Sequence, residues 1–263
     1  YGGNYKSHGP QYVRGIQEGN GIPEDGDLWL SYSVNKEDMW VSRIQVPVQL
    51  EATAHAKDDF SQAEKLADLT DWNLYSPLWA PVSLEGKWLK MSDRDPFDYC
   101  RIERKIPASK ELKVAFDIKA DQNDKGLLQI EFLDENSIAC ARIDLNPDGT
   151  MLSKGGARYG KLLNYEAGKS YHVEVILSVS KRMSEVFIDG KKAGQRMFFA
   201  PVAAIERIAF RTGERRTFPT IDTPADWDGT LADAGEQEPS VAYSISNFQT
   251  SSTDVSASAA VLN

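Results

Sequence analysis

The sequence predicts an all-β protein in two parts, and three features of the chain support this fold class. Apolar and polar residues alternate over 28–34 and 39–46, which is the period of a strand. From Trp72 onward, short apolar segments recur between turn residues, and many short strands of this kind are typical of a sandwich or barrel. Asn146-Pro-Asp-Gly149 and Asp189-Gly190 are strong hairpin turns.

Between the two parts we expect a connector over residues 51–71. Ser61-Gln-Ala-Glu64 has the spacing of a capping box, in which Ser61 accepts from the amide of Glu64 and Glu64 reaches back. The sequence therefore predicts a short helix over about 61–69. Its Leu66 and Leu69 would face a neighbouring element.

The second part covers residues 72–250. One face of each predicted strand is apolar and the other is largely polar, which indicates antiparallel sheets. Residues 213–240 form a long acidic segment, and such a loop is either functional or mobile. Residues 251–263 are expected to be a flexible tail. Strands are predicted near 88–91, 99–105, 112–119, 127–133, 138–145, 171–179, 184–188, 205–211 and 243–249.

Composition and charge exclude several classes of function. The net charge of -9 argues against nucleic acid as a partner, because a basic face is the expected footprint of such binding. Local basic residues can still hold a neutral or anionic sugar. The longest apolar runs are too short to span a membrane. Motifs for a P-loop, a dinucleotide fold, a zinc peptidase and a serine nucleophile elbow are absent from the sequence.

The chain has two cysteines, Cys100 and Cys140, and neither belongs to a metal-type CxxC pair. Both lie on predicted strands. A disulfide between strands and two buried thiols are both compatible with the sequence.

The later half of the chain resembles a known family of β-sandwiches. Tyr171-His-Val-Glu-Val-Ile-Leu177 followed by Glu185-Val-Phe-Ile-Asp-Gly190 resembles a hairpin of concanavalin A-like (laminin G-like) jelly rolls. Ile205-Glu-Arg-Ile-Ala-Phe-Arg-Thr-Gly213 and Tyr243-Ser-Ile-Ser-Asn-Phe248 resemble its closing strands. The resemblance implies a concanavalin A-like jelly-roll sandwich over 72–250. That fold hosts lectins, glycosidases, lyases and structural modules.

Residues 1–50 resemble the end of bacterial BNR-repeat (sialidase-like) β-propellers. The residues that carry the likeness are Tyr5, His8-Gly-Pro-Gln-Tyr-Val-Arg14, Gly26-Asp-Leu-Trp29 and Asn35-Lys-Glu-Asp-Met-Trp-Val-Ser-Arg-Ile44. The likeness implies a closing blade whose remaining blades lie upstream or in a second chain, because one blade cannot bury its own faces. It also implies a secreted protein of the periplasm or cell surface. A complete Asp box is absent, and one blade does not contain the arginine triad of sialidases.

The propeller likeness makes His8, Tyr12 and Arg14 candidate catalytic residues, because such segments reach the central pocket of a propeller. A histidine can act as general acid or base near neutral pH, and an arginine can hold a sugar carboxylate by two parallel bonds. The alternative is a structural histidine beside an arginine in an ion pair. Lys36, in a charged turn, is a candidate anion contact or a solvated hairpin tip.

Trp72, Trp79 and Trp88 are candidate substrate-binding residues, since aromatic faces suit the C–H surfaces of sugars. Alternatively, these tryptophans line the boundary between the two parts. Asp134 and Asn136 have oxygen ligands at a calcium-like spacing, although no complete loop motif is present. We therefore expect no required cofactor and keep calcium as an option.

Three functions agree with these features. The first is part of a secreted carbohydrate-active enzyme, a glycoside hydrolase or polysaccharide lyase, with polysaccharides that contain acidic sugars among its candidate substrates. The second is a non-catalytic, lectin-like carbohydrate-binding module. The third is a structural sandwich that braces a propeller.

Overall fold

The computed structural model describes residues 10–17, 27–34, 38–45, 52–95, 99–213, 237 and 239–252. These residues form strands and turns, with a single turn of 3₁₀ helix among them, so the predicted all-β class is confirmed. The described strands fall into two compact units, β1–β3 in one and β4–β18 in the other. No helix in these ranges is long and apolar enough to cross a membrane.

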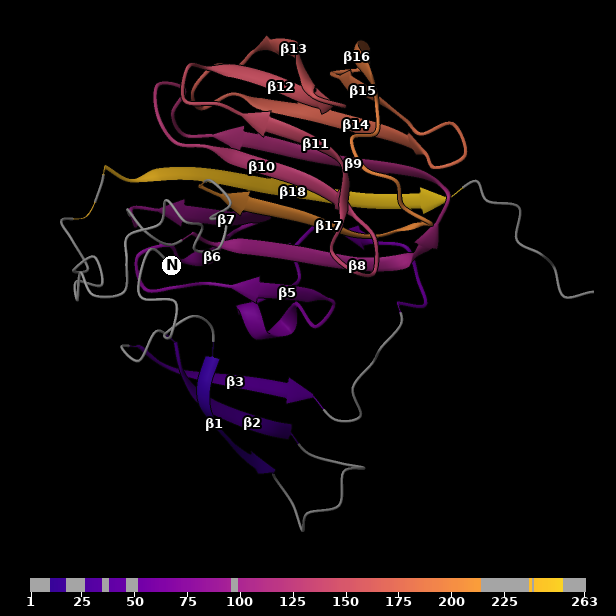
Figure 1. The fold of residues 1–263 in the computed structure, drawn as a ribbon. Helices are drawn as coiled ribbons and strands as arrows, with labels where there is room; N and C mark the ends of the chain where they lie inside the picture. The colour runs from indigo at the N-terminus through magenta and orange to yellow at the C-terminus, as the bar shows by residue number, and fades with distance from the viewer. Residues whose placement is uncertain are drawn as a thin grey trace, which may run out of the picture. The chain divides into compact units, whose positions relative to one another are not determined.

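The first unit is a three-stranded antiparallel sheet in the order β1 (Pro10–Gln17), β2 (Asp27–Val34) and β3 (Asp38–Gln45) (Figure 1). Its strands β2 and β3 confirm the two predicted from alternation. The Tyr32 hydroxyl lies 2.8 Å from Ser42 Oγ, across the β2–β3 pair. Met39 and Val41 on β3 are exposed. The assignment of this sheet to a propeller stays a prediction.

The second unit is a sandwich of two antiparallel sheets (Figure 1). The seven-stranded sheet has the order β13 (Arg158–Asn164), β12 (Thr150–Gly155), β11 (Ala139–Leu145), β10 (Leu128–Leu133), β17 (Ile205–Thr212), β8 (Arg101–Ser109) and β5 (Trp72–Tyr75).

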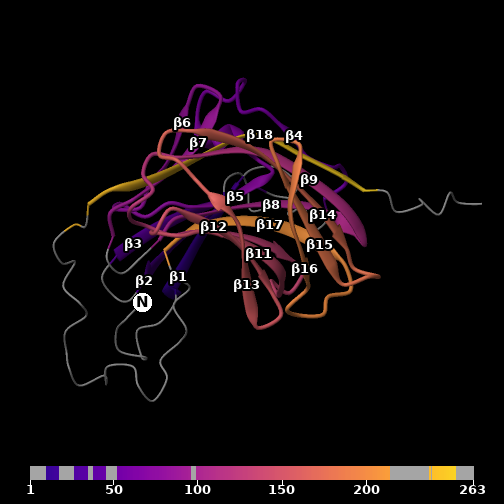
Figure 2. The same cartoon turned by 90° about the horizontal axis from the view of Figure 1, so that it is seen from above.

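The eight-stranded sheet has the order β16 (Lys191–Met197), β15 (Met183–Ile188), β14 (Ser170–Ser178), β9 (Glu111–Ala120), β18 (Val241–Ser252), β7 (Trp88–Asp93) and β6 (Val82–Glu85), with β4 (Lys57–Asp58) paired to β18. Seen from above, this sheet arches around the seven-stranded sheet (Figure 2). The seven-stranded sheet therefore has its outer surface on the concave side of the sandwich.

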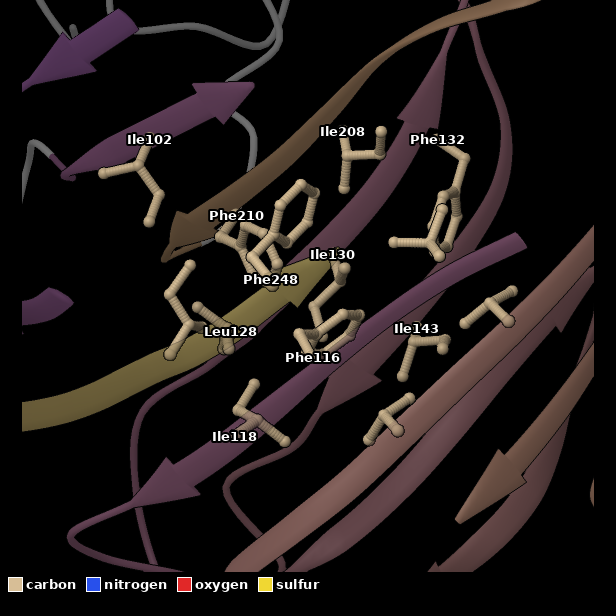
Figure 3. Close-up of a cluster of buried hydrophobic side chains, with 14 of the residues drawn as sticks. Ile102, Phe116, Ile118, Leu128, Ile130, Phe132, Ile143, Ile208, Phe210 and Phe248 are labelled. Atoms are coloured by element: carbon tan, nitrogen blue, oxygen red, sulfur yellow. The ribbon is translucent and has the colours of Figure 1, made fainter. Parts of the chain in front are cut away.

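The hydrophobic core lies between the two sheets (Figure 3). Phe116 of β9 meets Phe210 of β17 edge to face, with ring centroids 5.1 Å apart. Phe248 of β18 lies 6.1 Å from Phe210 by the same measure, and all three rings are fully buried. Offset and edge-on ring pairs of this kind stabilise a core beyond the area they bury.

The short helix predicted over about 61–69 is present only as one 3₁₀ turn, η2 (Leu66–Asp68), and the rest of this range is turn and bend. At its start, Asp68 Oδ2 accepts from the amides of Glu64 and Lys65, each at 3.0 Å. Ser61 does not cap a helix, since its hydroxyl and its amide both bond to Asp59 Oδ1 at 2.9 Å. Leu66 does pack against the core as expected.

Cys100 and Cys140 are both free and buried, so the sequence alternative of two buried thiols is correct and the disulfide is not formed. Burial raises the pKa of the Cys140 thiol to about 12. At neutral pH this thiol is protonated and unreactive, because the thiolate is the nucleophilic form.

Candidate functional site

The most distinctive surface of the sandwich is the outer face of the seven-stranded sheet. Because side chains alternate along a strand, Gln129 and Glu131 of β10 point away from the core that holds Ile130. The same alternation places side chains from all seven strands on this surface, which we call the outer face. Its polar and aromatic members are Asn73, Tyr75, Arg101, Glu103, Lys105, Gln129, Glu131, Arg142, Asp144, Lys154, Tyr159, Lys161, Arg207 and Arg211.

Basic side chains outnumber carboxylates on the outer face, in contrast to the acidic chain as a whole. Arginines come from β8, β11 and β17, and lysines from β8, β12 and β13, whereas the carboxylates are Glu103, Glu131 and Asp144. These three carboxylates are nevertheless buried. A buried charge destabilises the fold unless nearby groups compensate it, so each of these carboxylates is expected to have a charged or hydrogen-bonding partner.

Glu103 is held between two arginines. Its Oε2 lies 2.5 Å from Arg101 Nη2, and its Oε1 lies 3.2 Å from Arg207 Nη1. Asn73 Nδ2 donates to the same Oε1 at 3.3 Å. Charge-assisted bonds of this kind are roughly twice as strong as neutral ones, so they hold Glu103 in one arrangement with its three partners.

Arg211 of β17 lies opposite Arg101 of β8, and its guanidinium is also held by contacts within the protein. It donates to the carbonyl of Gly213 at 2.9 Å and to the side-chain oxygen of Gln129. Its guanidinium lies 5.2 Å from the ring centroid of Tyr99, and Tyr99 lies 5.7 Å from Tyr75. A pair of tyrosine rings therefore borders one end of the outer face.

The other end of the outer face carries Arg142, Lys154 and Tyr159. Arg142 Nε lies 3.0 Å from Asp144 Oδ1, close enough for an ion pair although the angle misses that of a hydrogen bond. Arg142 also donates to the Tyr159 hydroxyl, and Lys154 lies 4.6 Å from the Phe199 ring centroid. Arg142 Cζ and Lys154 Nζ each lie 5.9 Å from the Tyr159 ring centroid, and the residue is still 47% exposed, so part of it remains open to solvent.

Asp144 is the titratable group that the face perturbs most clearly. Burial raises the pKa of its carboxyl to about 6, against the attraction of Arg142 and with a smaller contribution from the negative charge of Glu131. Burial disfavours the charged form of a carboxyl, which is the direction seen here. The face therefore holds one carboxyl that takes up a proton just below neutral pH.

The candidate catalytic and anion-binding residues lie in the first unit. His8 and Lys36 are outside the described residues. Tyr12 and Arg14 lie on β1, and Arg14 is exposed next to Ser31 of β2. Their roles stay predictions.

Trp72 does not lie on a surface. It is only 6% exposed, its ring packs against Phe60 and Phe248, and its Nε1 donates to Asp58 Oδ2 at 2.9 Å. This ring has no free face for a sugar, because Trp72 lies on the inward side of β5.

Trp79 and Trp88 are half-buried at two other places. Trp79 lies in the turn between β5 and β6. Trp88 starts β7 in the eight-stranded sheet, with Lys119 Nζ 5.4 Å from its ring centroid. The three tryptophans that are close in sequence therefore do not form one platform in the fold.

Asp134 serves the backbone of its own turn. Its Oδ1 accepts from the amides of Asn136 at 2.9 Å and Ile138 at 2.8 Å, and Asn136 is exposed. Within the described ranges, His, Cys, Asp and Glu side chains form no group of three or more that could hold a metal ion. The calcium option at Asp134 and Asn136 gains no support from this geometry.

The sequence did not single out the outer face. One signal was present, since Arg101, Glu103 and Lys105 alternate with Ile102 and with Ile106 further along β8. Polar alternation alone indicates a solvated strand face. Only the pairing of seven strands brings these side chains into one ion-paired surface.

Comparison with known proteins gives one family match and several similar structures. The model of the family "Sialidase-like, CBM domain" matches residues 72–227. A solved structure titled "Sialidase" is 69% identical with a TM-score of 0.89, and the match covers 97% of this chain and 24% of that chain. The present chain thus spans about a quarter of that protein. No curated protein matches the sequence.

Two solved structures share the sandwich at low identity. The carbohydrate recognition domain of Emp47p is 9% identical with a TM-score of 0.50, over 77% of this chain and 98% of that one. A structure from work on endo-acting O-glycanases of human gut microbiota is 12% identical with a TM-score of 0.53, over 74% and 97%. At such identities the likeness shows the fold alone.

Proposed function

This chain belongs to the sialidase-like CBM domain family, where CBM stands for carbohydrate-binding module, and we propose that its sandwich binds a glycan on the outer face of the seven-stranded sheet. The family supplies the class of ligand, and the geometry supplies the surface. The proposal thus favours a binding role for the sandwich over a purely structural one.

The observation that carries this proposal is the pre-organised polar surface between two aromatic borders. Tyr75 and Tyr99 border one end, and Tyr159 borders the other. Between them, ion pairs such as Glu103 with Arg207 fix the side chains before any ligand arrives. Binding costs less when the contacting groups are already ordered. Sugar sites combine aromatic surface with a few fixed polar groups, and the outer face offers both.

A second candidate function concerns the longer protein from which this chain would come. We propose a secreted carbohydrate-active enzyme, either a glycoside hydrolase or a polysaccharide lyase, in which β1–β3 complete a catalytic propeller. The identity to a longer protein titled "Sialidase" and the exposed Met39 and Val41 support a sheet that has neighbours elsewhere. His8, Tyr12, Arg14 and Lys36 would then contribute to that site. Activity assays of His8→Ala in the longer protein, with its fold intact, test this role.

The binding role is tested by removing the exposed aromatic border of the outer face. We expect Tyr159→Ala to weaken glycan binding about tenfold, because an aromatic contact contributes on the order of 1 kcal/mol beyond its buried area. The measurement is isothermal titration calorimetry of the full chain with the oligosaccharide that a neutral and acidic glycan array identifies.

The matched control is Phe187→Ala, which removes a half-buried aromatic ring from the outer side of the eight-stranded sheet. This control should leave the affinity unchanged. Equal losses in the two variants would mean a general effect on the fold. If only Phe187→Ala weakened the affinity, the glycan would bind to the eight-stranded sheet and not to the outer face.

A further inference from the structure

We propose that Glu131 is the hydrogen-bond acceptor that selects the sugar on the outer face, and that it takes the hydroxyl groups of a neutral sugar residue. This inference rests on the proposed glycan-binding function and goes beyond it, because it names the contacting group and the class of sugar. It concerns one side chain in the middle strands of the face.

Glu131 lies deep in the outer face. On β10 it is opposite Arg142 of β11 on one side and Ala209 of β17 on the other. The residue is only 5% exposed. A carboxylate at such a position has lost most of its hydration, and an ionised group that is not compensated there destabilises the fold.

Glu131 differs from the other charged groups of the face in its partners. Among the described residues, its carboxylate has no hydrogen bond and no ion pair, although its charge acts on nearby Asp144. Neither of its oxygens belongs to the fully enclosed polar atoms that lack a partner, so both still reach the surface. Glu131 therefore offers a free acceptor at the base of the face.

The neighbouring arginines do not supply the missing partner. Arg142 contacts Asp144 and Tyr159, Arg207 contacts Glu103, and Arg211 donates to Gln129. Each of these guanidiniums thus contacts another acceptor of the protein. Arg142 Nε and Arg207 Nε have no hydrogen-bond partner, but both atoms are fully enclosed and a ligand cannot reach them. The carboxylate of Glu131 is not enclosed in this way, so the ligand can provide donors to it.

Sugar hydroxyls are suitable donors for this acceptor. A carboxylate has two oxygens, so it can accept from two adjacent hydroxyls at once, and such charge-assisted bonds are short and strong. A uronate or sialic acid carboxylate at the same place would meet like charge from Glu131. A buried like charge that repels one class of ligand is a common way to obtain specificity for another class. A neutral residue of the glycan therefore fits over Glu131.

The test compares Glu131→Gln with wild type in the full chain. The probes are neutral oligosaccharides of glucose, galactose, mannose and xylose, with oligogalacturonate and sialyllactose as acidic probes. We expect Glu131→Gln to weaken binding of the neutral probe at least tenfold. The melting temperature should be unchanged or higher, because the substitution removes an uncompensated charge without a change in shape.

Two further variants complete the design. Glu185→Gln is the matched control, since Glu185 is an ion-paired carboxylate on the eight-stranded sheet, 3.1 Å from Lys192, and its replacement should leave affinity unchanged. Glu131→Asp keeps the charge on a side chain that is one methylene shorter. The carboxylate then lies further from the ligand, so this variant should also weaken binding.

Three outcomes would overturn the inference, and they are distinguishable. Unchanged affinity in Glu131→Gln removes this residue from the site while the proposed function stands. If wild type binds no neutral probe and Glu131→Gln binds an acidic probe more tightly, the face takes an acidic sugar and the proposed preference for a neutral one is wrong. Failure of the wild-type chain to bind any probe contradicts the proposed function itself.

Discussion

Arg104→Ala should destabilise the sandwich by up to about 3 kcal/mol, because it removes a buried side chain together with its two ion pairs. Arg104 lies on β8 with only 6% of its side chain exposed, on the inward side of the seven-stranded sheet. Its Nε lies 2.8 Å from Asp58 Oδ2, and its Nη2 lies 2.9 Å from Asp71 Oδ2. Asp58 belongs to β4, which pairs with the opposite sheet.

The reason for the large effect is the position of this ion pair at the edge of the core. Without Arg104, the Asp58 carboxylate keeps the Trp72 indole as a donor but loses its cation. The measurement is urea unfolding of the full chain followed by tryptophan fluorescence. Arg158→Ala, at an exposed position on β13, should change stability by less than about 0.5 kcal/mol.

A double variant separates the lost charge from the lost packing. Arg104→Leu with Asp58→Asn removes two of the three charges, leaves only the exposed Asp71 carboxylate, and should recover part of the loss. No recovery would mean that the arginine acts through packing and through its bond to the Lys105 carbonyl.

Asp144→Asn should stabilise the protein near pH 8 by up to about 3 kcal/mol, since one pKa unit corresponds to about 1.4 kcal/mol. The pKa of Asp144 is raised by burial from 3.8 to about 6. Below pH 3.8 the carboxyl is protonated in both the folded and the unfolded chain, so its burial costs least there. This stability is lost as pH rises from 3.8 through about 6, because the buried carboxyl must then ionise. The gain from Asn should therefore be small near pH 4 and full above pH 7.

Thermal unfolding of both proteins across this pH range checks the expectation. Asp124→Asn, at an exposed loop position, is the control and should show no comparable pH dependence. A loss of stability in Asp144→Asn at every pH would mean that the ion pair with Arg142 outweighs the cost of burial.

Much of the sandwich could be predicted from the sequence because its central strands alternate strongly. The strands β9 and β14 place Val114, Phe116 and Val173 at every second position, and this pattern needs no knowledge of the neighbours. Strands such as β13 and β16 are rich in Gly, Lys and Arg, so they lack this signal. Their residues are chosen by neighbours that the pattern does not reveal. At Gly160 the Arg196 guanidinium lies where a Cβ would be, so a side chain there would require Arg196 to move.

The candidate site was less predictable for the same physical reason. Trp72 is a residue type that often stacks on sugars, but here its ring is buried by Phe60 and Phe248. Phe248 lies far away in sequence, and no pattern around Phe60 marks it as a partner of Trp72. Conversely, Glu131 sits in an ordinary strand segment. Its isolation becomes evident only when the partners of the surrounding arginines are known.

The most direct test of the glycan-binding outer face is a titration of the ¹⁵N-labelled chain with the oligosaccharide selected by the array. The account predicts saturable shifts in the backbone amides of β8, β10, β11 and β17, together with those near Tyr159. Amides of β14 and β15 should stay unchanged. Shifts confined to the eight-stranded sheet would contradict the claim that the seven-stranded sheet carries the binding surface.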